Sequence, residues 1–285
     1  MLAKLTKHEF TSIARVGLPA YITMLVVSII GRVMTWVSSR QYIIDNVPVS
    51  FVKIIKVFSS LISTIYVIAF MSLLILTLFY MIYRFYKNFF TDEGYLMLTL
   101  PVRSSSLIFS KLFNTWIWLF FSAVIAILSL YITLGHYDEL MDSVSGVFDS
   151  LKDVIEREGD YLREELGVPL WVFAIEAVVC IFMLANRFIL TWYAAVSFGL
   201  LLSKKHKALG TIFAYIIVDI ASWVLMGLFV AGVTKIMPNF LGDLSTSAGK
   251  ALQASVAGVS ITYFIFSALL FWFTSFIMKH RLNLD

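Results

Sequence analysis

The chain has 285 residues, of which 60% are hydrophobic and 14% charged, and its formal net charge is +4. Soluble domains carry about 25% charged residues, so a soluble fold of this length could not bury so much apolar surface. The composition therefore predicts an all-α polytopic membrane protein, and the small basic excess gives no reason to expect nucleic acid as a partner. The single cysteine, Cys180, excludes an intramolecular disulfide and a cysteine metal cluster.

Six long apolar stretches are the predicted transmembrane helices of a single transmembrane domain, 1–285. They are expected at about 16–37, 57–83, 107–134, 168–202, 209–233 and 256–278. The fourth stretch has about 35 residues, which is more than one bilayer needs. It should therefore project beyond the lipid or bend.

Two further segments show helical patterns outside these spans. Residues 1–15 have a modest amphipathic pattern, which we interpret as an interfacial helix; a plain basic flank to the first span would give the same pattern. Residues 136–167 hold ten acidic side chains against three basic ones, with apolar residues at helical spacing. This acidic segment is predicted to form one or two helices outside the membrane.

The distribution of basic residues predicts the orientation. Six spans place both termini on one side, and the segments on that side hold twelve Lys or Arg, against eight thinly spread on the other. Because basic loops remain in the cytoplasm, both termini and residues 84–106 are predicted to be cytoplasmic, and the acidic segment extracellular.

The stretch 84–106, between the second and third spans, has the features of a docking element. Basic residues flank it, and inside it an acidic pair precedes a short apolar run that cannot cross a bilayer and that a proline ends. The residues expected to dock are Thr91, Asp92, Glu93, Gly94, Tyr95, Leu96, Met97, Leu98, Leu100 and Pro101. As a solvated loop, this run would leave its apolar side chains without a partner, which favours docking.

Catalytic motifs are missing from the sequence. The four histidines form no H-E-x-x-H pattern, and no G-x-S-x-G elbow occurs. Residues 242–250 superficially resemble a phosphate-binding loop, but six residues separate the glycines where four are required, and Ala251 replaces the required Ser or Thr. We therefore expect no ATPase, enzyme active site, metal or cofactor in this chain.

Four ionisable residues lie in or near the predicted spans: Arg32, Glu176, Arg187 and Asp219. Charged groups are costly in lipid and are candidate functional residues. Glu176 and Arg187 share one face of the fourth span but lie about 16 Å apart along a straight helix, too far to pair. Two interpretations remain open. In the first, Glu176 lies above the lipid on the projecting helix, and Arg32 and Arg187 reach the interface or bind neighbouring carbonyls. In the second, the charges form a polar lining that faces the bundle interior or a partner subunit.

Several runs carry a resemblance to a known family. They are Phe85-Tyr86-Lys87-Asn88, Asp92-Glu93-Gly94-Tyr95-Leu96-Met97-Leu98-Thr99-Leu100-Pro101-Val102, Lys111-Leu112, the opening Leu5-x-Lys7-x-Glu9-Phe10, Ser203-Lys204-Lys205-His206-Lys207 and the ending Lys279-x-Arg281-Leu282-Asn283-Leu284-Asp285. These runs resemble permease subunits of type-2 ABC exporters from Gram-positive gut bacteria. The resemblance implies that residues 91–101 form the coupling helix, which sits in a groove of a cytoplasmic ATPase. Outer loops in that family are usually small, and the acidic segment here is larger.

The sequence therefore predicts the permease subunit of an ABC transporter in a bacterial cell membrane, an exporter of a peptide, antibiotic or lipid-like substrate. It would work with a second permease, identical or related, and with two copies of a separate ATPase that binds ATP and Mg. The alternative is a membrane scaffold or sensor subunit that transports nothing and binds a partner through the acidic segment.

Overall fold

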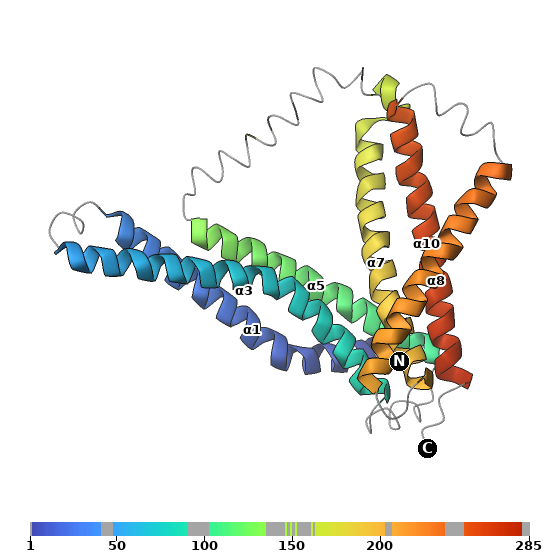
Figure 1. Ribbon diagram of the computed structural model, residues 1–285, viewed down its shortest axis with the longest axis horizontal. Helices are drawn as coiled ribbons and strands as arrows, with labels where there is room; N and C mark the ends of the chain where they lie inside the picture. The colour runs from blue at the N-terminus through green and yellow to red at the C-terminus, as the bar shows by residue number, and fades with distance from the viewer. Residues whose placement is uncertain are drawn as a thin grey trace. The chain divides into compact units, whose positions relative to one another are not determined.

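The computed structural model describes residues 2–40, 48–90, 103–134, 146, 149, 152, 161, 163–202, 207–236 and 248–280. Its long helices are α1 (Leu2–Ser39), α3 (Val49–Phe90), α5 (Ser104–Leu134), α7 (Leu170–Leu202), α8 (Lys207–Ile236) and α10 (Ala248–His280) (Figure 1). Each of the six is long and apolar enough to cross a membrane. The predicted helical chain with six apolar spans is confirmed for the described residues, which contain no strand.

Several helices extend well beyond the predicted spans. α3 has 42 residues and a length of about 63 Å, roughly twice the hydrocarbon thickness of a bilayer. α1 runs without interruption from Leu2, so residues 2–15 are helical and continuous with the first span. Their location at the interface remains a prediction. α1 is bent (Figure 1) and contains Pro19, which removes one backbone hydrogen bond and crowds the preceding turn.

The helices pack as two compact units. The first comprises Met1–Arg84 and Phe109–Val147, and the second Phe85–Ile108 and Phe148–Asp285. In the first unit, α1, α3 and α5 share a core of Ile13, Tyr21, Met24, Tyr66, Leu73, Met81, Trp118 and Ala126. Gly17 provides room for the Trp118 ring, because a Cβ at this position would lie 2.6 Å from Trp118 Cζ3.

In the second unit, α7 packs against both α8 and α10. Small residues allow the close approach, as is usual between membrane helices. Ala194, Ala195 and Ala214 are completely buried. A Cβ on Gly199 would lie 2.6 Å from the Cα of Thr211, so the backbones of α7 and α8 are in contact there.

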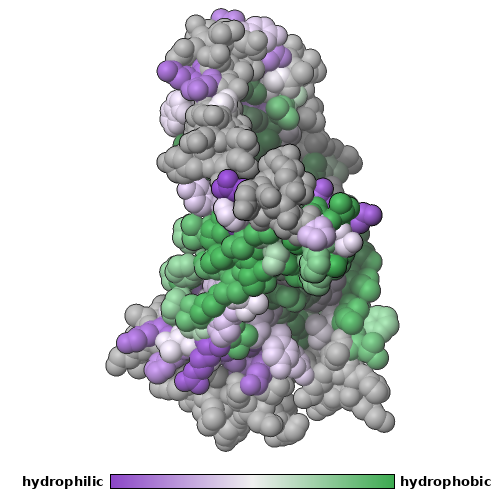
Figure 2. Space-filling view, turned by 90° about the vertical axis from the view of Figure 1, so that its left-hand side faces the viewer, coloured by the Kyte–Doolittle hydropathy of each residue, from purple (hydrophilic) through white to green (hydrophobic). Residues whose placement is uncertain are grey.

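The outer surface of the helices is apolar. Large side chains such as Phe120, Trp171 and Trp272 are more than 60% exposed. Figure 2 shows one face on which hydrophobic side chains form a broad continuous area. Such a surface is stable in lipid and would aggregate in water.

The acidic segment predicted at 136–167 is described at residues 146, 149, 152, 161 and 163–167, of which 163–166 form one helical turn. This turn is attached to the start of α10. The Glu165 carboxylate accepts a hydrogen bond from the Gly249 backbone N–H at 3.2 Å. A carboxylate is favourable at a helix N-terminus, where backbone N–H groups lack partners. The end of the acidic segment is therefore fixed to the transmembrane helices of the second unit.

Candidate coupling site and intramembrane charges

The predicted docking residues, Thr91 to Pro101, lie outside the described residues, but both of their flanks lie within them. α3 ends at Phe90, and α5 begins at Ser104. The candidate site can therefore be built from the contacts that hold these two helix ends.

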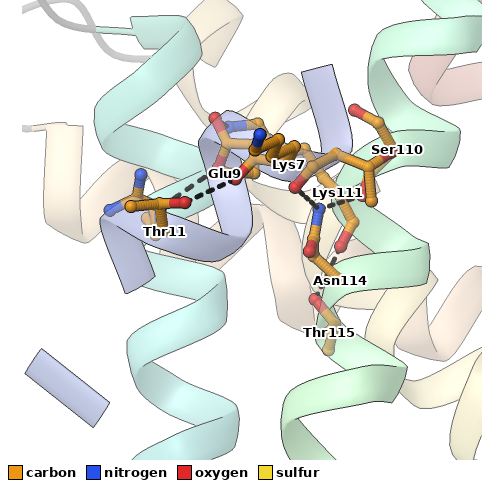
Figure 3. Close-up of polar contacts among 9 residues, drawn as sticks. Lys7, Glu9, Thr11, Ser110, Lys111, Asn114 and Thr115 are labelled. Atoms are coloured by element: carbon orange, nitrogen blue, oxygen red, sulfur yellow. Dashed lines mark hydrogen bonds and ion pairs between the residues drawn. The ribbon is translucent and has the colours of Figure 1, made fainter. Parts of the chain in front are cut away.

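A buried carboxylate joins the helices on either side of the docking stretch. Glu9 of α1 accepts a hydrogen bond from Arg84 Nε of α3 at 3.1 Å, and its other oxygen pairs with Lys111 Nζ of α5. Glu9 is 7% exposed and Lys111 is 5% exposed. Figure 3 shows the Glu9 and Lys111 side chains approaching each other from their two helices. One anion therefore connects the three helices α1, α3 and α5.

Neighbouring polar groups fix the position of this cluster. Asn114, also on α5, donates from Nδ2 to the Ser110 carbonyl at 3.0 Å and to the Thr6 carbonyl of α1 at 3.4 Å. Thr115 donates to the Lys111 carbonyl at 2.9 Å (Figure 3). Removing one partner of a buried ion pair typically costs about 3–5 kcal/mol, because the remaining charge stays buried. The cluster should therefore hold the three helices firmly in register.

A second set of polar contacts lies further along the same three helices. The Tyr21 and Ser122 hydroxyls are 2.6 Å apart, and Ser122 Oγ donates to Thr77 Oγ1 at 2.8 Å. Tyr21 comes from α1, Ser122 from α5 and Thr77 from α3. Interhelical hydrogen bonds of this kind contribute about 0.6–2 kcal/mol each in membrane proteins. Two sets of polar contacts, the Glu9 cluster and the hydrogen bonds of Ser122, therefore hold α1, α3 and α5 together.

Residues 85–90 of α3 belong to the second unit. The Phe85 ring stacks on the Tyr193 ring of α7, with 3.9 Å between centroids and 6° between planes. Phe89 meets Phe85 edge-on at 5.1 Å. All three rings are completely buried. Within the second unit, residues 85–90 therefore pack against α7.

Arg187 and Asp219 are brought together inside the second unit. Arg187 of α7 is 8% exposed and donates to Asp219 Oδ1 at 3.4 Å and to Ser222 Oγ at 2.8 Å, both on α8. Its guanidinium carbon lies 4.8 Å from the Trp223 ring centroid of α8 and 5.5 Å from that of Tyr263 of α10. These are the contacts expected for a side chain that faces protein rather than lipid.

The other two intramembrane residues lie elsewhere. Glu176 does not approach Arg187 on their common helix. Its carboxylate oxygens instead accept hydrogen bonds from Gln253 Nε2 of α10 at 3.1 and 3.2 Å. Arg32 is half-buried on α1, in the first unit. Of the four intramembrane residues, Arg187 and Asp219 therefore pair with each other. Glu176 and Arg32 lie apart from this pair and from one another.

Sequence reasoning did not single out Glu9, Phe85 or Tyr193 for these contacts. A local signal exists for Glu9, because it lies four residues before Ile13 and therefore on the same face of α1, which is buried. A carboxylate on the apolar face of a helix needs a cation. No local pattern identifies the Phe85–Tyr193 stack, because both residues lie in generally apolar helices.

The described helices and their apolar surfaces identify a multi-pass α-helical membrane protein. In comparisons with protein-family models, curated protein sequences and solved structures, nothing matches this chain.

Proposed function

We propose that this chain is the permease subunit of an ABC exporter, driven by a separate cytoplasmic ATPase that docks on residues 91–101. The observation that carries the proposal is the ion-pair cluster of Glu9, Arg84 and Lys111, which joins the two helices bordering that segment. The resemblance of the segment to the coupling region of type-2 ABC exporters supports the same assignment.

In such a protein the cluster would transmit movement of the coupling helix to the transmembrane helices. Closure of the ATPase displaces the coupling helix, and this displacement moves the transmembrane helices only if the connection is stiff. Arg84 lies six residues before the end of α3, and Lys111 seven residues after the start of α5. Because both pair with Glu9, the two helices and α1 move together when either is displaced. If the ends of α3 and α5 were not connected through Glu9, each would move by itself, and the rest of the helices would stay in place.

The remaining features of the proposal follow from this assignment. Both termini and residues 84–106 lie in the cytoplasm of a bacterial cell, and the acidic segment lies outside. Two permeases, identical or related, form a dimer with two ATPase copies, which bind ATP and Mg. A peptide, antibiotic or lipid-like substrate moves between the two bundles by alternating access.

The test is purification of the tagged chain from its native membranes, followed by measurement of ATP hydrolysis. A Walker-type ATPase should co-purify in one-to-one ratio with the permease, and substrate should stimulate its hydrolysis. Purification without an ATPase would favour the scaffold or sensor alternative. Co-purification with hydrolysis that no exported compound changes would favour an ATPase-bound sensor over an exporter.

A further inference from the structure

The Glu9 cluster of the first unit contains more positive than negative charge. Glu9 is the only acidic side chain among the described residues of this unit, and it pairs with two cations, Arg84 and Lys111. Two cations share one carboxylate, so one positive charge remains without compensation. Charges in partly buried places are costly unless they are paired, which favours the binding of a further anion here.

Arg84 is the member of the cluster that is able to bind this anion. A guanidinium has five N–H donors in a planar fork, and in the described part of the chain Glu9 takes only the donor on Nε. The Arg84 side chain is 16% exposed, against 5% for Lys111. The two terminal nitrogens of Arg84, Nη1 and Nη2, are neither hydrogen-bonded to a described residue nor buried. The end of the side chain therefore presents the paired donors that bind two oxygens of a phosphate or carboxylate.

The position of Arg84 along α3 is that of a lipid headgroup. Between Lys56 and Arg84 the helix carries no charged side chain, and the two residues lie about 42 Å apart along its axis. A bilayer with its headgroup regions is about 40–45 Å thick, so the two basic residues reach its two polar surfaces. Tyr83, beside Arg84, is 57% exposed, as is typical of tyrosines at this level.

An exposed apolar stripe leads from this level toward the middle of α3. Tyr83, Phe79 and Leu76 are spaced four and three residues apart, so they lie on one face of the helix. They are 57%, 47% and 63% exposed. An acyl chain packs along such a stripe, whereas a free phosphate ion gains nothing from it. The stripe therefore favours a lipid over a free anion.

We propose that Arg84 binds the phosphate group of an anionic phospholipid. Nη1 and Nη2 donate to two phosphate oxygens, while Nε stays bonded to Glu9. The lipid charge compensates the positive charge that Glu9 leaves unpaired. In the proposed orientation this site lies in the cytoplasmic leaflet, whose surface is anionic. The lipid site does not depend on the exporter assignment, because a scaffold with the same helices would present the same guanidinium.

The experiment measures lipid binding to the purified full chain, delipidated in a neutral detergent, by native mass spectrometry. The probes are dioleoyl phosphatidylglycerol, which is anionic, and dioleoyl phosphatidylcholine, which has the same chains and no net charge. The parent should bind one phosphatidylglycerol molecule about five-fold more tightly than phosphatidylcholine, the factor expected for one basic residue at a membrane surface.

Variants of Arg84 test whether this side chain carries the preference. Arg84→Lys keeps the charge and the pairing with Glu9 but removes the planar fork, so it should lose most of the preference. Arg84→Gln removes the charge and should lose it as well. Arg40→Lys is the matched control, because Arg40 is an exposed arginine of the same unit that stacks on Trp36. It should keep the parental preference. Melting temperatures of all variants are measured in parallel.

Three outcomes would overturn the proposal. The first is equal affinity of the parent for the two lipids, and the second is an unchanged preference in folded Arg84→Lys. The third is an equal loss in Arg40→Lys, which would mean that any surface arginine attracts the lipid. Excess inorganic phosphate, compared with chloride at equal ionic strength, separates lipid from free anion. Bound phosphatidylglycerol should persist equally in both salts, and selective displacement by phosphate would contradict the lipid assignment. No measurement involves an ATPase, so these results are independent of the proposed function.

Discussion

The Arg187 guanidinium of α7 and the Asp219 carboxylate of α8 form an ion pair at 3.4 Å between two helices that are apolar enough to cross a membrane. Asp219 keeps a third of its side chain exposed, whereas Arg187 retains 10%. Arg187 also contacts Ser222 and the rings of Trp223 and Tyr263. Arg187 is therefore the centre of this contact between α7, α8 and α10.

Arg187→Leu should destabilise the protein and impair assembly or transport. The substitution leaves Asp219 without its cation in a largely apolar environment, which typically costs about 3 kcal/mol. Asp219→Asn should cost less, because the amide stays polar and Arg187 keeps Ser222. The measurement is thermal unfolding in detergent by intrinsic fluorescence, with transport measured in parallel. Arg163→Leu, at an exposed position in the same unit, is the matched control. Parental stability and transport in Arg187→Leu would show that the pair contributes nothing.

Gly17→Ala should destabilise the first unit by about 1–3 kcal/mol through overpacking against Trp118. A Cβ at Gly17 lies 2.6 Å from Trp118 Cζ3, and the indole is 2% exposed, so it has little room to move. Gly31→Ala on the same helix is the control, because the nearest atom to its Cβ is Ile62 Cγ2 at 3.8 Å. It should be neutral or stabilising, since Ala favours helix by about 1 kcal/mol over Gly. Equal melting temperatures for the two variants would contradict the packing described here.

Gly199→Ala should be more damaging than Gly17→Ala. Its Cβ would meet backbone atoms of α8, with Thr211 Cα at 2.6 Å and Thr211 N at 2.7 Å, and backbone cannot adopt another rotamer. The helices α7 and α8 must separate locally to admit the methyl group. Gly227→Ala has nothing within 4 Å of its Cβ and is the control in the same unit. The comparison uses yield of monodisperse protein and melting temperature. A Gly199→Ala variant as stable as Gly227→Ala would disprove the close approach.

The orientation can be tested by labelling single cysteines from outside intact cells, on a background without Cys180. A membrane-impermeant maleimide should modify position 146 and spare positions 94 and 205. The charge distribution is the physical reason, since basic segments remain cytoplasmic. Permeabilised cells provide the control, in which all three positions should react. Labelling of position 94 in intact cells would reverse the proposed orientation.

The sequence allowed the helices to be predicted but not their contacts. Hydropathy located six spans because each has a long apolar window, and the helices of the structure continue beyond these windows where polar residues follow. The second span was expected to begin at 57, whereas α3 begins at Val49 and includes Lys53 and Lys56. Charged residues lower the hydropathy without breaking a helix, so a helix in a membrane protein can continue beyond its apolar window.

The ion pairs depend on long-range geometry that no local pattern contains. Glu9 and Arg84 are 75 residues apart, and Arg187 and Asp219 are 32 apart. Membrane helices are apolar on most faces, so periodicity does not reveal which face meets which neighbour. The rule that intramembrane charges need partners singled out Arg32, Glu176, Arg187 and Asp219 alike, and the structure pairs Arg187 with Asp219. Helix geometry excluded Glu176 as the partner of Arg187, but nothing in the sequence identified Asp219 as that partner.

The central claim is that residues 91–101 dock into a cytoplasmic ATPase. Tyr95→Ala with Leu98→Ala removes two apolar anchors, and buried anchors of this kind typically contribute about 1–2 kcal/mol or more each. Asp92→Asn should weaken binding mildly, by less than about 1 kcal/mol, and more visibly at low salt. The control is Phe240→Ala with Leu244→Ala, which truncates two apolar residues between the fifth and sixth predicted spans, a connection that the predicted orientation places outside the cell.

The most direct measurement is capture of the ATPase by tagged permease in detergent, with ATP hydrolysis measured on the same samples. The account predicts that the Tyr95→Ala, Leu98→Ala variant inserts and dimerises normally, captures no ATPase and shows no associated hydrolysis, while the Phe240→Ala, Leu244→Ala control behaves as the parent. Normal capture of the ATPase by the Tyr95→Ala, Leu98→Ala variant would contradict the coupling assignment and, with it, the proposal of an ABC permease.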